Sequence, residues 1–179
     1  MTGKAVTVIV VMGVASSGKT TVAAGLAKRL GWTFRDADSF HPPANVAKMS
    51  AGTPLADADR WPWLDAIVVW MNARADAGEP AVVTCSALKR GYRDRLRTSR
   101  ADIRLVHLHG SRELLAARIA ARQAHFMPPA LLDSQFATLE MPTPDEHAYR
   151  VSVETPPEDI MAELADVFGA IAMTAGRQA

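Results

Sequence analysis

The chain has 179 residues and a formal net charge of +1, from 20 basic and 19 acidic side chains. Its 49% apolar and 22% charged residues are typical of one soluble globular domain, and the charge balance gives no reason to expect a nucleic-acid partner. No apolar stretch approaches the roughly 20 residues of a membrane span, and the single cysteine, Cys85, excludes an internal disulfide. We therefore expect one domain over residues 1–179, in the cytoplasm and without a membrane partner.

The first predicted element is a buried strand over Val6–Met12, an apolar and β-branched run. Directly after it, Gly13–Thr20 fits the phosphate-binding pattern G-x-x-x-x-G-K-[ST]. Val22, Leu26 and Leu30 then follow at a spacing of four, which predicts a helix. A strand, a glycine loop and a helix in this order indicate a site for a nucleoside triphosphate.

The chemistry of such a loop assigns roles to its residues. Glycines let backbone N–H groups turn inward around a phosphate, and the new helix points its positive end at the same place. Lys19 would reach the β- and γ-phosphates, and the Thr20 hydroxyl would take a place on Mg²⁺. The nucleotide is expected to contact Gly13, Ala15, Ser16, Ser17, Gly18, Lys19, Thr20 and Thr21.

Strand and helix patterns alternate through the rest of the chain. Further strands are expected at 32–35, 80–85, 103–108 and 149–153, and helices at 57–77, 91–99, after Ser111 and after Thr155. This alternation predicts an α/β fold with a five-stranded parallel sheet and helices on both faces. The one break in composition covers about 122–144, with four prolines. We expect a mobile lid there, over 118–142.

Two carboxylates follow the second predicted strand. Asp36 and Asp38 are two residues apart on an extended segment, so they point the same way. One could hold Mg²⁺ through its water shell while the other accepts a proton from an attacking hydroxyl. Alternatively they are turn or cap residues, which is a common role of aspartate.

Basic residues mark the other candidate positions. The third strand ends without an acidic residue and runs into Lys89 and Arg90, which could grip an anionic substrate, as could Arg60. Arg118 and Arg122 lie one helical turn apart at the start of the lid and could neutralise charge on the γ-phosphoryl group. An exposed pair of arginines at this spacing can also be merely solubilising.

These motifs, in this order, resemble the gluconokinase family of small P-loop sugar-acid kinases. The resemblance covers residues 8 to about 162. It rests on the phosphate loop, Asp36-Ala37-Asp38 with His41 and Lys48, Cys85-Ser86-Ala87-Leu88-Lys89-Arg90, and Gln135-Phe136 with Leu139-Glu140.

The resemblance implies a nucleoside-monophosphate-kinase-like fold and ATP- and Mg²⁺-dependent phosphorylation of D-gluconate to 6-phospho-D-gluconate by a homodimer. It implies that Asp38 is the base and that Asp36 is linked to Mg²⁺ through water. Arg118 would then lie near the adenine and Arg122 near the phosphates. The substrate would be bound by Asp38, His41, Lys48, Arg60, Lys89 and Arg90.

Two other functions stay open from the residues alone. One is a kinase for another small acceptor such as shikimate, although such an enzyme should show three glycines where this chain has Ser86-Ala87-Leu88. The other is a nucleotide-binding sensor without catalysis, which predicts a missing base or lid.

Overall fold

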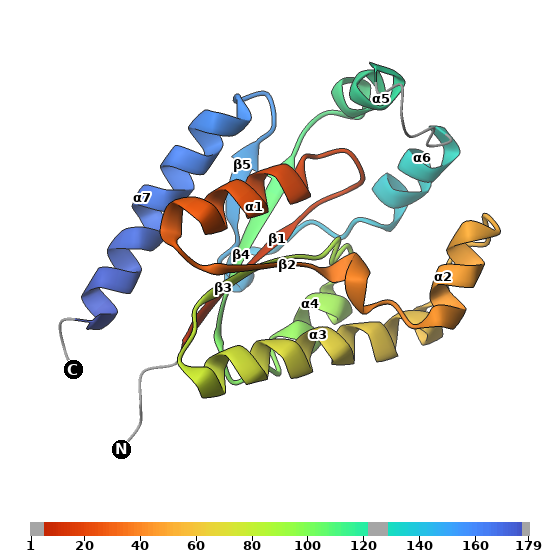
Figure 1. Ribbon diagram of the computed structural model, residues 1–179. Helices are drawn as coiled ribbons and strands as arrows, with labels where there is room; N and C mark the ends of the chain where they lie inside the picture. Colours follow the sequence, from red (N-terminus) through yellow and green to blue (C-terminus); the bar gives the residue numbers. More distant parts are fainter. Residues whose placement is uncertain (1–5, 122–128, 177–179) are drawn as a thin grey trace.

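The core of the computed structural model is a parallel sheet of five strands, and the structure describes residues 6–121 and 129–176. The strand order is β2-β3-β1-β4-β5, and every neighbouring pair is parallel (Figure 1). The strands are β1 (Thr7–Met12), β2 (Thr33–Asp36), β3 (Ala81–Thr84), β4 (Asp102–His109) and β5 (Tyr149–Ser152). The predicted fold class is therefore confirmed, with strand ends shifted by a few residues.

The central strand β1 separates two apolar layers because successive side chains of a strand point to opposite faces. Ile9 and Val11 pack into one layer, whereas Val8, Val10 and Met12 pack into the other. The first layer is closed by α1 (Lys19–Leu30) and α7 (Pro157–Gly176), and the second by α3 (Asp57–Ala77) and α4 (Arg90–Leu96). All five of these β1 side chains are fully buried, so both layers share one rigid strand.

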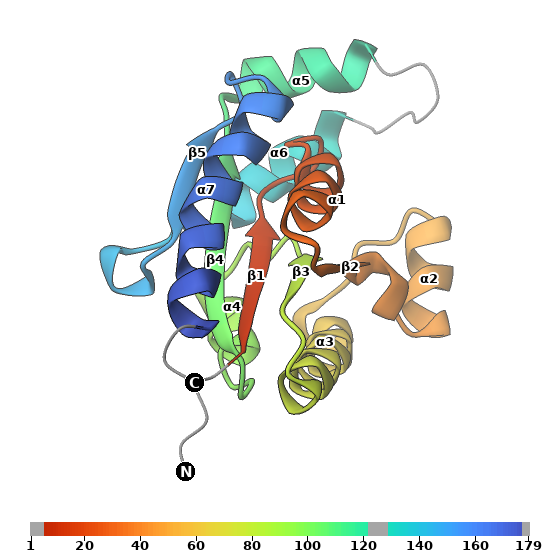
Figure 2. The same cartoon turned by 60° about the vertical axis from the view of Figure 1, so that its left-hand side comes forward.

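Two helices lie where the sequence predicted none. They are α2 (Pro43–Ser50) and α6 (Pro129–Thr138), and short 3₁₀ turns cover 37–40 and 144–146. Figure 2 shows α2 beside β2, and α6 together with α5 (Arg112–Ala121) beyond the end toward which β1 points. Both unpredicted helices therefore lie near the carboxyl ends of the strands, where open α/β sheets bind ligands.

No helix within the described residues is long and apolar enough to span a membrane.

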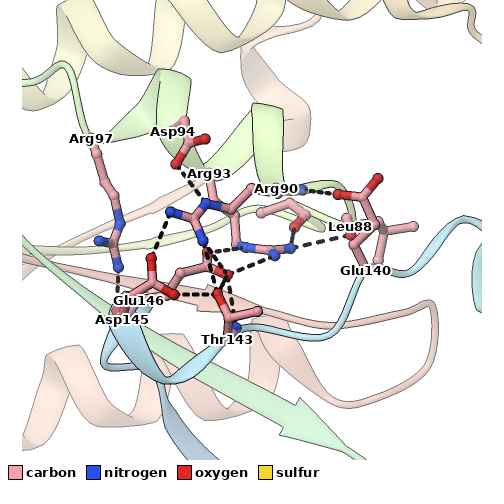
Figure 3. A network of polar contacts seen from close by, with 10 residues as sticks. Leu88, Arg90, Arg93, Asp94, Arg97, Glu140, Thr143, Asp145 and Glu146 are labelled. Carbon is pink, nitrogen blue, oxygen red and sulfur yellow. Dashed lines mark hydrogen bonds and ion pairs between the residues drawn. The ribbon is translucent and has the colours of Figure 1, made fainter.

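A buried ion pair fastens the start of α4 to the segment that follows α6 (Figure 3). Arg93 donates to both carboxylate oxygens of Glu146, at 2.5 and 3.0 Å, and to the carbonyl oxygens of Ala87 and Leu88. Neither charged side chain is exposed. Although burial opposes it, the hydrogen bonds from Arg93 and from the Thr143 N–H lower the pKa of Glu146. The pair thus orders the chain directly after β3.

Removing one partner of this pair should be costly. We expect Arg93→Met to lower the free energy of unfolding by about 3–5 kcal/mol, because Glu146 would stay buried without its counter-charge. The double variant Arg93→Met/Glu146→Met should be distinctly more stable than Arg93→Met alone. Urea unfolding measures both. Arg100→Met, which breaks an exposed pair with Asp76, is the matched control and should cost at most about 1 kcal/mol. Strictly additive losses in the double variant would contradict the expectation.

Candidate active site

The loop between β1 and α1 has a backbone that only glycine fits at its first position. Gly13 has φ +148°, and an added Cβ would lie 2.6 Å from the Leu108 carbonyl oxygen and 2.8 Å from Ser17 Oγ. Gly18 has φ +88° and caps the N-terminus of α1. Since these values are unfavourable for other residues, the two glycines fix the shape that the sequence predicted for a phosphate loop.

Polar atoms of the loop fit a bound phosphate. The Lys19 ammonium group donates to the Val14 carbonyl oxygen at 3.0 Å, so its side chain curls back over the loop. Ser17 Oγ is buried and has no hydrogen-bond partner among the described residues. A buried hydroxyl without a partner is costly, and a phosphate oxygen would supply one. The loop therefore fits a bound phosphate group.

Asp36 connects this loop to the end of β2. Its carboxylate accepts hydrogen bonds from the Thr20 hydroxyl, the Thr84 hydroxyl and the Asp38 N–H, each at 3.0 Å. Thr20 and Asp36, the two residues predicted to serve a metal, thus lie side by side. Hydroxyl and carboxylate oxygens are the ligands that Mg²⁺ prefers, so this pair fits that ion.

Asp38 follows in the 3₁₀ turn after β2, with its side chain 88% exposed. Desolvation by the surrounding protein, followed by the nearby Asp36 carboxylate, raises the pKa of Asp38. His41 and Lys19 oppose this shift. A carboxylate that is reachable from solvent and more basic than usual can accept a proton from a hydroxyl.

His41 is held in one orientation beside Asp38. Its ring stacks on Trp63 with centroids 4.5 Å apart, and its Nδ1 lies 3.3 Å from Asn45 Nδ2. Its Nε2 lies 3.9 Å from an Asp38 carboxylate oxygen. Burial lowers the pKa of His41, so the ring favours its neutral form. A neutral, oriented imidazole beside Asp38 can hydrogen-bond a hydroxyl of a polyol.

A second cluster brings Arg60 and Lys89 together around Asp57. The Lys89 ammonium lies 2.9 and 2.8 Å from the two Asp57 carboxylate oxygens, and the Tyr92 hydroxyl donates to the same carboxylate. Arg60 donates to the Tyr92 hydroxyl at 3.2 Å and lies 3.8 Å from Asp57. The Lys89 contact lowers the pKa of Asp57 and raises that of Lys89. The cluster carries two cations against one carboxylate and can accept an anionic group.

Site prediction from the residues alone did not place Asp57 in this cluster. Asp57 lies 35 residues before Tyr92 in the chain, so neither spacing nor periodicity joins the two. Lys48, on α2, is close to this region but pairs with Asp59 at 2.6 Å.

Arg90 is placed differently from Lys89. Its guanidinium group contacts Asp94, Thr143 and Asp145 within the network of Figure 3. The backbone N–H of Arg90 donates to the Glu140 carboxylate at 2.6 Å. Three protein groups thus hold the Arg90 guanidinium, and its role in substrate binding stays a prediction.

Three further residues that the sequence analysis assigned to the nucleotide lie within the described part of the chain. Arg118, on α5, donates to the Val153 carbonyl oxygen at the end of β5. Thr21 lies in the first turn of α1 with its side chain exposed, and Ser16 adopts φ +60° within the loop. Arg122 lies outside the described residues.

Comparisons with known proteins identify the family of the chain. The family described as AAA domain matches residues 8–142. The chain is 54% identical over 162 residues to the gluconokinase of Gluconobacter oxydans, covering 90% of this chain and 91% of that protein. It is 37% identical over 161 residues to the thermoresistant gluconokinase of Escherichia coli, covering 89% and 92%.

A solved structure extends the likeness to three dimensions. The crystal structure of a gluconokinase from Sinorhizobium meliloti matches with a TM-score of 0.82 at 44% identity, covering 96% of each chain. Sequence and structure thus agree over nearly the whole length, and the chain belongs to the gluconokinase family of P-loop kinases.

Proposed function

We propose that this chain transfers the γ-phosphoryl group of ATP to D-gluconate and forms 6-phospho-D-gluconate. One observation carries the proposal. Asp36 hydrogen-bonds Thr20 at the phosphate loop and also accepts from the backbone of Asp38. We therefore expect the exposed carboxylate of Asp38 to reach the end of a bound triphosphate, in a chain of the gluconokinase family.

In this reaction Asp38 accepts the proton of the terminal hydroxyl of gluconate. That oxygen forms a bond to the γ-phosphorus, the bond from the γ-phosphorus to the β,γ-bridging oxygen breaks, and ADP leaves. Lys19 and the loop amides hold the triphosphate. Thr20, and Asp36 through water, would hold Mg²⁺, which supplies neutralisation of phosphate charge.

The carboxylate of gluconate suits the cluster of Arg60 and Lys89. Both cations already face one carboxylate, Asp57, so their side chains are ordered before the substrate arrives. His41, fixed by Trp63, would hydrogen-bond a hydroxyl of the sugar acid. Lys48 and Arg90 stay predictions as further substrate contacts.

Several expectations from the sequence remain predictions. They are the single domain over 1–179 with a lid over 118–142, the placement of Arg118 and Arg122 around the nucleotide, the homodimer and the cytoplasmic location.

Replacing the proposed base should stop the chemistry and leave nucleotide binding in place. We expect Asp38→Asn to lower kcat by about 10²–10⁴-fold, as is typical for loss of general base catalysis, while the KM for ATP changes little. A coupled assay of ADP formation with D-gluconate, other aldonic acids, shikimate and no acceptor measures this. Asp65→Asn, which breaks a surface pair with Arg95, is the control and should keep wild-type activity. Faster turnover on shikimate than on gluconate would overturn the substrate assignment.

The rate should also fall on the acid side of its pH profile. Asp38 works as a base only when deprotonated, and its pKa is raised from 3.8. The rate should therefore rise with pH through a midpoint above 3.8. Initial rates of the wild type and Asp38→Asn, at pH values where circular dichroism shows both folded, test this. An identical acid limb in the variant would assign the titration to another group.

Lys89 should contribute to the binding of gluconate and not to the binding of ATP. A hydrogen bond to a charged group contributes roughly 1.5–3 kcal/mol, so Lys89→Ala should raise the KM for gluconate about 10–100-fold. The KM for ATP should stay within about twofold of the wild type, because Lys89 lies in the Asp57 cluster and not at the phosphate loop. Lys28→Ala, at an exposed position of α1, is the matched control. An equal rise in both KM values would indicate general disruption instead of a lost substrate contact.

A further inference from the structure

A side chain of α6 occupies a hydrogen-bonding position of the phosphate loop. The Ala15 N–H donates to the side-chain carbonyl oxygen of Gln135 at 2.6 Å, although the two residues are 120 positions apart. In a P-loop, backbone N–H groups such as this one are the donors that cradle phosphates. Gln135 therefore sits where its amide meets the phosphate-binding surface.

The position of Gln135 does not depend on this one hydrogen bond. Leu132 is buried, and Phe136 and Leu139 pack against the core layer that includes Val14. Asp133 pairs with Arg112 of α5 at 2.5 Å. These contacts hold α6 over the loop, so Gln135 stays beside Ala15 whichever group accepts the Ala15 N–H.

A pocket of about 320 Å³ lies next to this part of α6. Its lining includes Val14 of the phosphate loop and Phe136, the residue after Gln135 in the chain. Gln135 itself is half-buried.

The chemistry of a primary amide suits both states of the loop. Its carbonyl oxygen can accept from a backbone N–H, and its NH₂ group can donate to a phosphoryl oxygen. One N–H serves one good acceptor, so a phosphoryl oxygen that takes the Ala15 N–H must displace the Gln135 carbonyl. After a turn of the amide, the NH₂ group lies within reach of that same oxygen.

We propose that Gln135 is a phosphate-binding residue of the transfer reaction. Its carbonyl oxygen holds the Ala15 amide before nucleotide binds, and its NH₂ group donates to the phosphoryl oxygen that replaces it. This inference rests on the proposed kinase function, since it names one more residue of the same site. It also explains why an amide is present: a carboxylate of the same shape would accept the Ala15 N–H and then repel the phosphate.

Two isosteric variants test the proposal. Gln135→Glu keeps the acceptor but adds a negative charge, and it should weaken ATP binding and raise the KM for ATP at least tenfold. Gln135→Met keeps the volume but loses the donor, and it should lower kcat by about tenfold. Both should leave the KM for gluconate within about twofold. Ser134→Ala, the exposed neighbour on α6, is the control and should match the wild type.

The measurements are isothermal titration with Mg-ATP, steady-state kinetics for each substrate and thermal unfolding of each variant. A purely structural role predicts that the melting temperature falls and that both KM values change together, and this result would overturn the proposal. So would ATP affinity and kcat within twofold of the wild type in both variants. A wild-type enzyme that fails to phosphorylate gluconate would instead refute the proposed function, and ATP titration would still report on Gln135.

Discussion

The hydrogen bond from Thr20 to Asp36 is the constraint on which the active site depends. β2 and β1 are not neighbours, because β3 lies between them in the sheet. The Asp36 carboxylate bridges this gap by accepting from Thr84 at the end of β3 and from Thr20 at the start of α1. The same carboxylate accepts the N–H of Asp38. The phosphate loop and the proposed base, Asp38, therefore keep a fixed relation through one side chain and three donors.

The cluster proposed to bind the substrate carboxylate contains its own counter-charge. The Asp57 carboxylate holds Lys89, Tyr92 and Arg60 around itself, so the cations meet an anion even before any substrate is present. An arriving carboxylate would share donors that are already oriented, and less side-chain entropy is lost on binding. This internal pairing also explains how a site for an anionic substrate can belong to a chain whose net charge is only +1.

The sequence patterns predicted the parts of the fold that are buried, and they failed where burial is slight. β1 and the loop after it follow from an apolar run and a glycine pattern that rarely arises by chance. α2 buries only Asn45, and α6 buries Leu132 with few other side chains, so neither shows an apolar stripe. The sequence analysis assigned the neighbours Lys89 and Arg90 the same role, binding of an anionic substrate. Lys89 is still extended at the N-cap, whereas Arg90 begins the helix, and this change of backbone sends the two side chains to different partners.

The helices α1 and α2, which flank the site, are held by different kinds of contact. α1 buries Val22, Ala23, Leu26 and Ala27 against the sheet, and its first residues carry the phosphate loop. α2 leaves Val46 and Met49 exposed and is tied to α3 through polar contacts to Asp59 from Asn45 and Lys48. Segments with few buried apolar contacts open at lower free energy than those in a core. The helix of the phosphate loop is therefore the more firmly held of the two, and α2 is the one that opens at lower free energy.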